Sequence, residues 1–293
     1  MEKLTLVVLA AGMGSRFGGQ KQTEGIDGRG HILLDYSLHD AILSGFGRAL
    51  FIIRKEMKDS FLSIVSGKGW FSKINVDFIF QDISDLPSGF KLPEIRSKPW
   101  GTAHAISCLF GKVYSPFAVI NADDFYGREA ISKIAKNLQN GECSMVGYNL
   151  CNTLSSYGAV SRGICEIKGG YLTEIVEKSG IINSEGKIID REGSEISPTA
   201  KTSMNLWGFT PEIADEAKDR FAHFLKENLA ENPGGCEYYL PSLVSSLIKE
   251  KKLKVRVINT DSKWYGLTYK KDKSEVSLAL EKMISDGIYP SIL

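Results

Sequence analysis

The stretch LTLVVLAAGMGSRFGGQKQ, residues 4–22, decides the fold of this chain. Its opening part is apolar and rich in β-branched residues, which predicts a buried strand over 4–10. The strand runs into a loop that combines several glycines with Arg16 and Lys21. Glycines let backbone N–H groups approach an anion closely, and the two cations would neutralise charge that the amides only polarise. The pattern predicts a strand followed by a phosphate-binding loop, with a plain strand–helix turn as the alternative.

Two common phosphate loops do not fit this stretch. It lacks the Gly-Lys-Ser/Thr ending of the Walker loop, and Phe17 stands where the pattern G-x-G-x-x-G requires its third glycine. What remains resembles the signature of the nucleotidyltransferase family that activates sugar phosphates, roughly L-A-A-G-x-G-[ST]-R-(several)-K. The resemblance implies that Arg16 and Lys21 are catalytic residues at the triphosphate. It also implies a set of nucleotide-binding residues in the same stretch: Leu9, Ala11, Gly12, Met13 and Gly14.

The bulk composition limits the partners and the location of the protein. The 293 residues include 36 basic and 35 acidic side chains, so no global field favours nucleic acid or an anionic membrane. No apolar run approaches the length of a membrane span, and Met1-Glu2-Lys3 leads directly into the first strand. The five cysteines form no C-x-x-C pair, which favours reduced thiols over a zinc site. We therefore expect a cytoplasmic protein, and the sequence leaves open whether it forms a homo-oligomer.

Strand-like runs alternate with amphipathic helical stretches in the first half of the chain. Helices are expected at 33–46, 57–65, 102–110 and 128–138, and strands at 49–53, 74–81, 117–121 and 144–149. This rhythm predicts an α/β protein with a three-layer α/β/α, Rossmann-like mixed sheet. The resemblance implies the same fold, of the nucleotide-diphospho-sugar transferase type.

From residue 157 the pattern changes to shorter strands with glycine-rich turns, expected at 158–160, 171–176, 188–189 and 202–209. Helices over 211–229 and 237–249 and a strand over 254–259 follow. We expect this half to extend the same sheet with an added sugar-binding lobe, because no Pro- or Ser-rich linker divides the chain. The prediction is one domain over 1–293, with a nucleotide-binding half (1–150) and an acceptor-binding half (151–293).

The strand expected at 117–121 ends in Asn121-Ala122-Asp123-Asp124. Carboxylates at the carboxyl end of a buried parallel strand face the crevice in which α/β sheets bind ligands. An Asp there holds Mg²⁺ through one or two oxygens, with phosphate and water as the other ligands. Family members carry an Asp at this point, so the resemblance implies that Asp123 is the catalytic metal ligand and Mg²⁺ the cofactor. A helix N-cap is the alternative, and it stays open for Asp124.

Two further stretches resemble the base-binding elements of the family. The segment Lys98-Pro99-Trp100-Gly101-Thr102-Ala103 is similar to its G-T-A loop, and Gln81 is similar to a residue that reads the base edge in many members. Gly101 lets backbone groups approach a flat base, since no Cβ intervenes. The resemblance implies that Gln81, Gly101 and Thr102 bind the nucleotide. For Thr102 a plain helix N-cap is the alternative.

The second half carries a candidate acceptor site. Tyr157-Gly158-Ala159-Val160 resembles the Y-G-x-V segment of the family, and Glu177-Lys178 resembles its E-K pair. The resemblance implies that Gly158 and these two residues line the sugar-phosphate pocket, with Lys178 on the phosphate and Glu177 accepting hydrogen bonds from hydroxyls. Asn205 falls in a segment that lines the pocket in family members, with a structural Asn as the alternative.

The chain departs from the family pattern near its end. Many members place a second metal carboxylate in a late turn, and here the nearby carboxylate, Asp261, is several residues out of register. Either Asp261 substitutes through a different loop path, or Asp123, phosphates and water hold the Mg²⁺.

The motifs together imply a nucleotidyltransferase that converts an NTP and a sugar 1-phosphate, its expected partners, into an NDP-sugar and pyrophosphate. The nucleophile would be a phosphate oxygen, which is anionic at neutral pH and needs no general base. Two alternatives stay open. One is a cytidylyl- or guanylyltransferase that acts on a non-sugar phosphate such as choline phosphate, and the other is a catalytically silent nucleotide-binding paralogue. The sequence specifies neither the base nor the sugar.

Overall fold

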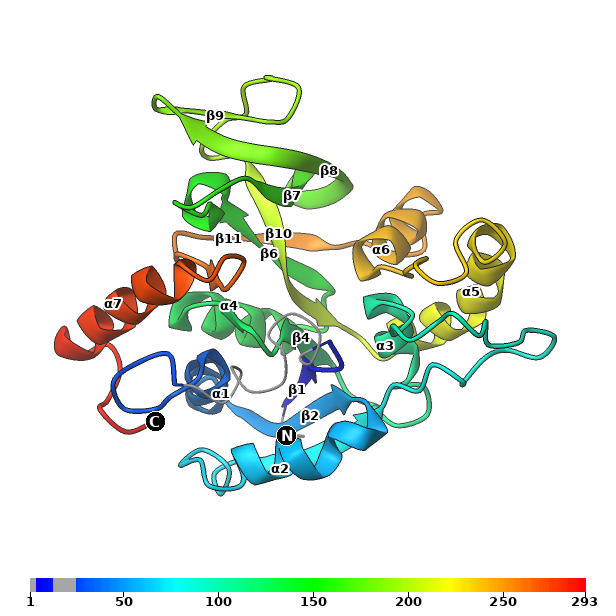
Figure 1. Ribbon diagram of the computed structural model, residues 1–293, viewed down its shortest axis with the longest axis horizontal. Helices are drawn as coiled ribbons and strands as arrows, with labels where there is room; N and C mark the ends of the chain where they lie inside the picture. The colour runs from blue at the N-terminus through cyan, green and yellow to red at the C-terminus, as the bar shows by residue number, and fades with distance from the viewer. Residues whose placement is uncertain (1–3, 13–24) are drawn as a thin grey trace.

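The computed structural model describes residues 4–12 and 25–293 of the chain (Figure 1). The first half forms the parallel part of a mixed sheet. Its strands lie side by side in the order β3 (Asn75–Phe80), β2 (Phe46–Ile53), β1 (Leu4–Leu9) and β4 (Phe117–Asn121). Every residue of β1 except Leu9 is buried, as the continuous apolar run predicts for a central parallel strand.

Helices cover both faces of this parallel part. On one face, Leu6 and Val8 of β1 pack with α1 (Leu33–Leu43), α2 (Lys58–Val65) and α4 (Arg128–Leu138). On the other face, Val7 packs with α3 (Thr102–Ser107), α5 (Glu212–Asn228) and α6 (Leu240–Lys249). Successive side chains of a strand point to opposite faces, so one apolar strand contributes to both cores.

The second half of the chain does not continue as an open sheet. Its strands are β6 (Ser144–Asn149), β7 (Val160–Lys168), β8 (Tyr171–Ser184), β10 (Lys201–Phe209) and β11 (Arg256–Thr260). The hairpin β7–β8 pairs with β11 at one edge and with β10 at the other. The strands β10, β6, β11, β8 and β7 therefore close a ring.

This ring qualifies the predicted architecture. The α/β class and the mixed sheet are confirmed, because β10 runs antiparallel to β4 and β6 while β11 runs parallel to β6. An open three-layer sandwich describes only the parallel half. The pairing of β7 with β8 contains register shifts. Such irregularities increase the twist and bending of a strand, which lets this hairpin reach β10.

Several predicted boundaries differ from the observed ones. The helix expected at 33–46 ends at Leu43, because Gly45 has a φ of 92° that stops the helix and Phe46 already belongs to β2. The strand expected at 171–176 extends to Ser184. The strands at 117–121 and 144–149 and the helix at 128–138 are confirmed.

The remaining elements are short or peripheral. They are β5 (Asp124–Phe125), β9 (Lys187–Ile189), β12 (Tyr265–Gly266) and α7 (Asp272–Ser285), with 3₁₀ turns at Lys55–Met57 and Leu150–Thr153. β12 pairs with β5, so the late turn of the chain lies directly beside Asp124. Over residues 4–12 and 25–293, none of the helices combines the length and the apolar character that a membrane crossing requires.

Candidate active site

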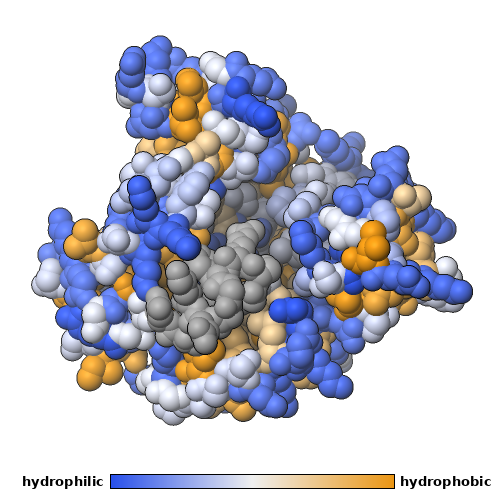
Figure 2. Space-filling view, in the orientation of Figure 1, coloured by the Kyte–Doolittle hydropathy of each residue, from blue (hydrophilic) through white to orange (hydrophobic). Residues whose placement is uncertain are grey.

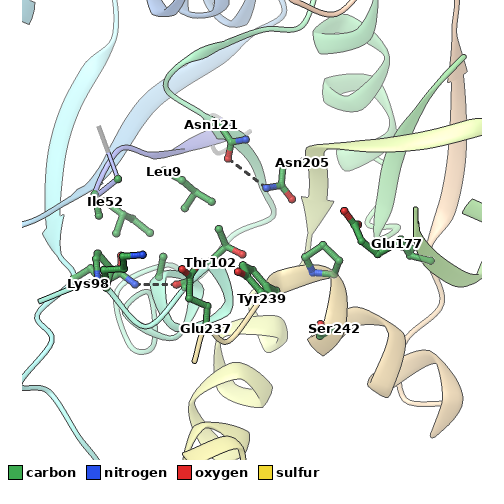
Figure 3. Close-up of a pocket in the computed structure, with 18 of the residues that line it drawn as sticks. Leu9, Ile52, Lys98, Thr102, Asn121, Glu177, Asn205, Glu237, Tyr239 and Ser242 are labelled. Atoms are coloured by element: carbon green, nitrogen blue, oxygen red, sulfur yellow. Dashed lines mark hydrogen bonds between the residues drawn. The ribbon is translucent and has the colours of Figure 1, made fainter. Parts of the chain in front are cut away.

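A cleft of about 1800 Å³ lies at the carboxyl ends of the parallel strands. Leu9 and Asn121 end β1 and β4, and Gln81 follows β3. The opposite wall comes from β8 and α6, with Glu177 and Ser242 (Figure 3). The space-filling view shows the molecule hollowed between the β7–β9 part and the α5–α6 part, with hydrophilic residues along the rim (Figure 2). Ligands of α/β sheets bind at such carboxyl ends, so this cleft is the candidate site.

Most of the predicted site residues meet in this cleft. Those that line it are Leu9, Ala11, Gly12, Gln81, Gly101, Thr102, Asp123, Glu177 and Asn205. Arg16, Lys21, Met13 and Gly14 lie outside the described residues, so their roles stay predictions. The fold thus brings the end of β1, the loop before α3, the end of β4 and the hairpin β7–β8 to one cavity.

Lys178 and Gly158 are not brought to the cleft. The ammonium Nζ of Lys178 lies 2.8 Å from Asp190 Oδ2, and this hydrogen bond raises the pKa of Lys178. Along β8 successive side chains point to opposite faces, so Glu177 faces the cleft and Lys178 faces away. Gly158 lies against Tyr269, whose ring would be 2.7 Å from an added Cβ. The structure therefore does not bring Lys178 and Gly158 to the described walls of the cleft, and their substrate contacts stay predictions.

Gly101 and Thr102 join the loop before α3 to the segment that starts α6. The φ of Gly101 is 102°, and an added Cβ would lie 2.6 Å from the carbonyl oxygen of Tyr238. The backbone N–H of Ala103 donates to that same oxygen at 2.8 Å, and the N–H of Leu240 donates to Thr102 Oγ1 at 2.9 Å. The N-cap of α3 is Gly101, so the N-cap alternative for Thr102 is wrong. This junction also carries Glu237 and Tyr239 into the cleft, which no sequence motif indicated.

Gln81 forms a hydrogen bond with the same loop. Its amide Nε2 donates to the carbonyl oxygen of Gly101 at 2.9 Å and lies 3.1 Å from His104 Nδ1. Because Nε2 is a donor, Nδ1 must be the acceptor, which requires a neutral imidazole. Burial lowers the pKa of His104 to about 4, in agreement with this arrangement. Gln81 therefore positions the backbone of Gly101, and His104 is a structural residue of α3.

Asp123 and Asp124 lie in different environments. Asp123 lines the cleft, whereas Asp124 is buried and its Oδ2 accepts hydrogen bonds from Asn121 Nδ2 at 2.8 Å and from Tyr126 OH at 3.2 Å. Burial, together with the charge of Asp123, raises the pKa of Asp124 to about 8. The helix that follows has Gly127 at its N-cap, so the N-cap alternative for Asp124 is wrong. Asp123 is the carboxylate that faces the cleft.

Asn205 presents a carboxamide beside Asp123. It has a φ of 63° and lies where the register of β10 shifts against β6. Asn tolerates this left-handed conformation better than most side chains, which explains its presence at the irregularity. Its Oδ1 accepts from Trp207 Nε1 at 3.1 Å, and its Nδ2 donates to Asn121 Oδ1 at 3.4 Å, the dashed line in Figure 3. The strand irregularity thus orients two carboxamides toward the cleft.

The side-chain oxygens of Asp123, Asn121 and Asn205 could hold Mg²⁺ only if a bound nucleotide supplied further ligands. Among the described residues, no group of three or more His, Cys, Asp or Glu side chains comes together. Asp261 is exposed, accepts a hydrogen bond from Asn149 Nδ2 at 3.2 Å, and lines neither cavity. A carboxylate at Asp123 with the carboxamides of Asn121 and Asn205 nearby suits a hard cation that takes its other ligands from phosphate and water.

A second cavity of about 280 Å³ adjoins the cleft. Asp123, Glu177 and Asn205 belong to the walls of both cavities. Arg162 of β7 and Trp264 line only the second one, with the guanidinium carbon 5.0 Å from the centre of the Trp264 ring. No motif singled out Arg162, since it lies two residues beyond the Y-G-x-V segment in a strand of mixed polarity.

Comparison with known proteins establishes the fold. No protein-family model matches this chain, and a search of curated proteins finds no match. A solved UDP-glucose pyrophosphorylase in complex with UDP-glucose superposes with a TM-score of 0.58 at 17% identity, over 96% of this chain and 99% of that chain. An inositol-1-phosphate CTP transferase from T. maritima superposes with a TM-score of 0.62 at 13% identity, over 99% and 98%. The chain shares the fold of these two proteins, in agreement with the resemblance that the motif at residues 4–22 carries.

Proposed function

We propose that this chain is an enzyme that transfers a nucleoside monophosphate from an NTP to a phosphate-bearing acceptor. The observation that carries the proposal is the meeting of Gly12, the Gly101–Thr102 loop and Asp123 in one cleft of this fold. The structural relatives point the same way, because by name one is a pyrophosphorylase in complex with UDP-glucose and the other a CTP transferase for inositol 1-phosphate.

The chemistry needs charge neutralisation and positioning. An oxygen of the acceptor phosphate forms a bond to the α-phosphorus, the bond from that phosphorus to the β-bridging oxygen breaks, and pyrophosphate leaves with the electron pair. No histidine is among the described residues that line the cleft, which suits a nucleophile that needs no general base. In our proposal Arg16 and Lys21 neutralise the triphosphate and Asp123 holds the Mg²⁺, which would polarise the phosphate oxygens when bound.

The acceptor end of the cleft favours a sugar phosphate over choline phosphate. Ser161, Glu177, Ser242 and Ser245 line this end, and hydroxyls and a carboxylate are suited to a polyol. A quaternary ammonium group is bound by open aromatic faces, but the guanidinium of Arg162 already covers the ring of Trp264. A second cation beside Arg162 would be repelled. We therefore propose a sugar 1-phosphate as the acceptor and an NDP-sugar as the product.

A matrix of substrates tests this function. Each of four NTPs is combined with glucose 1-phosphate, inositol 1-phosphate or choline phosphate in the presence of Mg²⁺, and pyrophosphate release is measured. We expect release that requires both substrates and is strongest with a sugar phosphate. NTP binding without any release would identify the silent paralogue, and release with choline phosphate alone would replace the sugar assignment.

A further inference from the structure

We propose that Arg162 binds the phosphate group of the acceptor in the second cavity, in place of the contact that the sequence predicts for Lys178. The inference rests on the proposed function and assigns one residue of its acceptor site. It concerns an anion-binding subsite next to Asp123, built by a side chain that no motif of the chain indicates.

The guanidinium of Arg162 is a buried charge with uncharged partners. The residue exposes 9% of its surface. Its Nε and Nη2 donate to the carbonyl oxygen of Thr153, and its Nη1 donates to the carbonyl oxygen of Ser161 at 2.8 Å. Across residues 4–12 and 25–293 it forms no ion pair with a carboxylate, and burial lowers its pKa to about 10. A buried charge without a close counter-charge is costly unless a ligand supplies one.

The hydrogen-bonding capacity of Arg162 is not exhausted by these contacts. A guanidinium has five N–H groups, and within the described residues Nε, Nη1 and Nη2 each use one. One N–H on each of Nη1 and Nη2 therefore remains. Arginine binds a phosphate through two oxygens with two of its N–H groups, which is the use that we propose for these two.

The position of the second cavity suits the acceptor phosphate. Its volume of about 280 Å³ is near the lower end of the usual range for ligand pockets, roughly 300–1,000 Å³. Asp123 and Glu177 line both the cleft and the second cavity. A phosphate held by Arg162 therefore lies next to Asp123, the proposed metal ligand. Glu177, whose pKa is raised by burial, then faces the hydroxyl-bearing part of the acceptor. Lys178 is engaged by Asp190 and has no access to this space.

A purely structural role is the competing explanation, since the charges of Asp124 and Glu177 act on Arg162. Kinetics of Arg162→Gln and Arg162→Lys separate the two. We expect the KM for the acceptor found in the substrate matrix to rise about ten- to a hundredfold in Arg162→Gln, the usual loss for one charge-assisted contact, and less in Arg162→Lys. The KM for NTP should change by less than about twofold.

The matched control is Arg256→Gln. Arg256 is the first residue of β11, forms an ion pair with Glu142, and lines neither cavity. It should leave both KM values at the wild-type level. An unchanged acceptor KM in Arg162→Gln, or an equal rise for both substrates, overturns the inference and leaves the proposed function intact.

A binding experiment keeps the inference testable if Arg162→Gln fails to fold or if no acceptor is found. The side-chain Nε–H signal of Arg162 in the folded wild-type protein is assigned by its loss in Arg162→Lys, and inorganic phosphate is titrated in. We expect a saturable shift of this signal that persists in Lys21→Ala. The absence of a shift in the wild-type protein overturns the inference, whereas the absence of turnover in the whole substrate matrix overturns the proposed function.

Discussion

Asp123 and Asp124 are neighbours in sequence but occupy opposite sides of the end of β4. The first faces the cleft, and the second is enclosed by Asn121, Tyr126 and Gly266, whose added Cβ would lie 3.1 Å from Asp124 Oδ1. Asp123 lines both cavities, whereas Asp124 lines only the second one and its Oδ2 is engaged by Asn121 and Tyr126, so we expect Asp123 to contact a substrate-bound cation. Asp123 lies in the turn between β4 and β5, whereas Asp124 is the first residue of β5, which pairs with β12.

The two carboxylates should therefore respond differently to neutralisation. Asp123→Asn should lower kcat by about two to three orders of magnitude, the usual effect of removing one electrostatic contact to a transition state. Asp124→Asn keeps an acceptor oxygen for Asn121, and burial already favours the neutral form of Asp124, so kcat should fall much less. Steady-state pyrophosphate release by the two variants checks the order, and the reverse order would shift the metal ligand by one residue.

His104 should make the stability of the protein depend on pH. Its pKa is lowered from 6.5 to about 4 in the folded state, so between these values the unfolded chain binds more protons. The contribution of His104 to the free energy of unfolding is fully present above pH 6.5. It is lost as the pH falls toward 4, by up to about 3 kcal/mol.

Urea unfolding at a series of pH values measures this effect. The difference in unfolding free energy between the wild-type protein and His104→Gln isolates the contribution of this side chain, because the other titrating groups cancel. Parallel curves for the two proteins between pH 4 and 6.5 would show that His104 is protonated in the folded state.

At single positions, the sequence predicted those roles that a local pattern determines. Asp123 and Gly101 occupy fixed places after a strand and before a helix, and both line the cleft as expected. Lys178 could not be placed, because the face of β8 toward which it points depends on pairing with β7 and on Asp190. Arg162 could not be found, because its significance depends on burial, which residues far apart in the chain create.

Among the elements, the junction between the loop before α3 and the start of α6 shapes the part of the cleft that we propose for the nucleotide. The two segments are 138 residues apart at the bond from Leu240 to Thr102. The helix expected at 237–249 begins only at Leu240, since residue 238 is engaged with the loop. No local pattern predicts that these two segments pair, although the sequence did single out Gly101, the glycine that permits their close approach.

Gly101→Ala should disrupt this junction. The added Cβ would meet the backbone of Tyr238 at 2.6 Å in addition to the strain of a positive φ, so we expect a loss of about 3 kcal/mol or more and weaker NTP binding. Gly89→Ala is the matched control, with a φ of 90° and nothing within 4 Å of its added Cβ. It should cost only the backbone strain, about 1–2 kcal/mol. Equal losses in thermal or urea unfolding would show that the contact with Tyr238 is unimportant.

For the molecule as a whole, the sequence predicted the parallel half better than the half that closes the ring. Buried parallel strands are continuous apolar runs, so β1 and β4 were visible in the sequence. The hairpin β7–β8 is half exposed and interrupted by glycines and charges, and its closure onto β10 depends on long-range pairing. Its closure nevertheless brings Glu177 to the walls of both cavities and Arg162 to the wall of the second one, where we propose that the acceptor binds.

In the proposed reaction a new bond joins the α-phosphorus of an NTP to an oxygen of the acceptor phosphate. ³¹P NMR of the reaction with the acceptor and NTP found in the substrate matrix observes this bond directly. For nucleotidyl transfer we expect a pair of mutually coupled signals from an unsymmetrical diphosphate, which grow together with an equal amount of pyrophosphate. Orthophosphate, or a nucleoside diphosphate with a phosphorylated acceptor, in place of these signals would contradict nucleotidyl transfer.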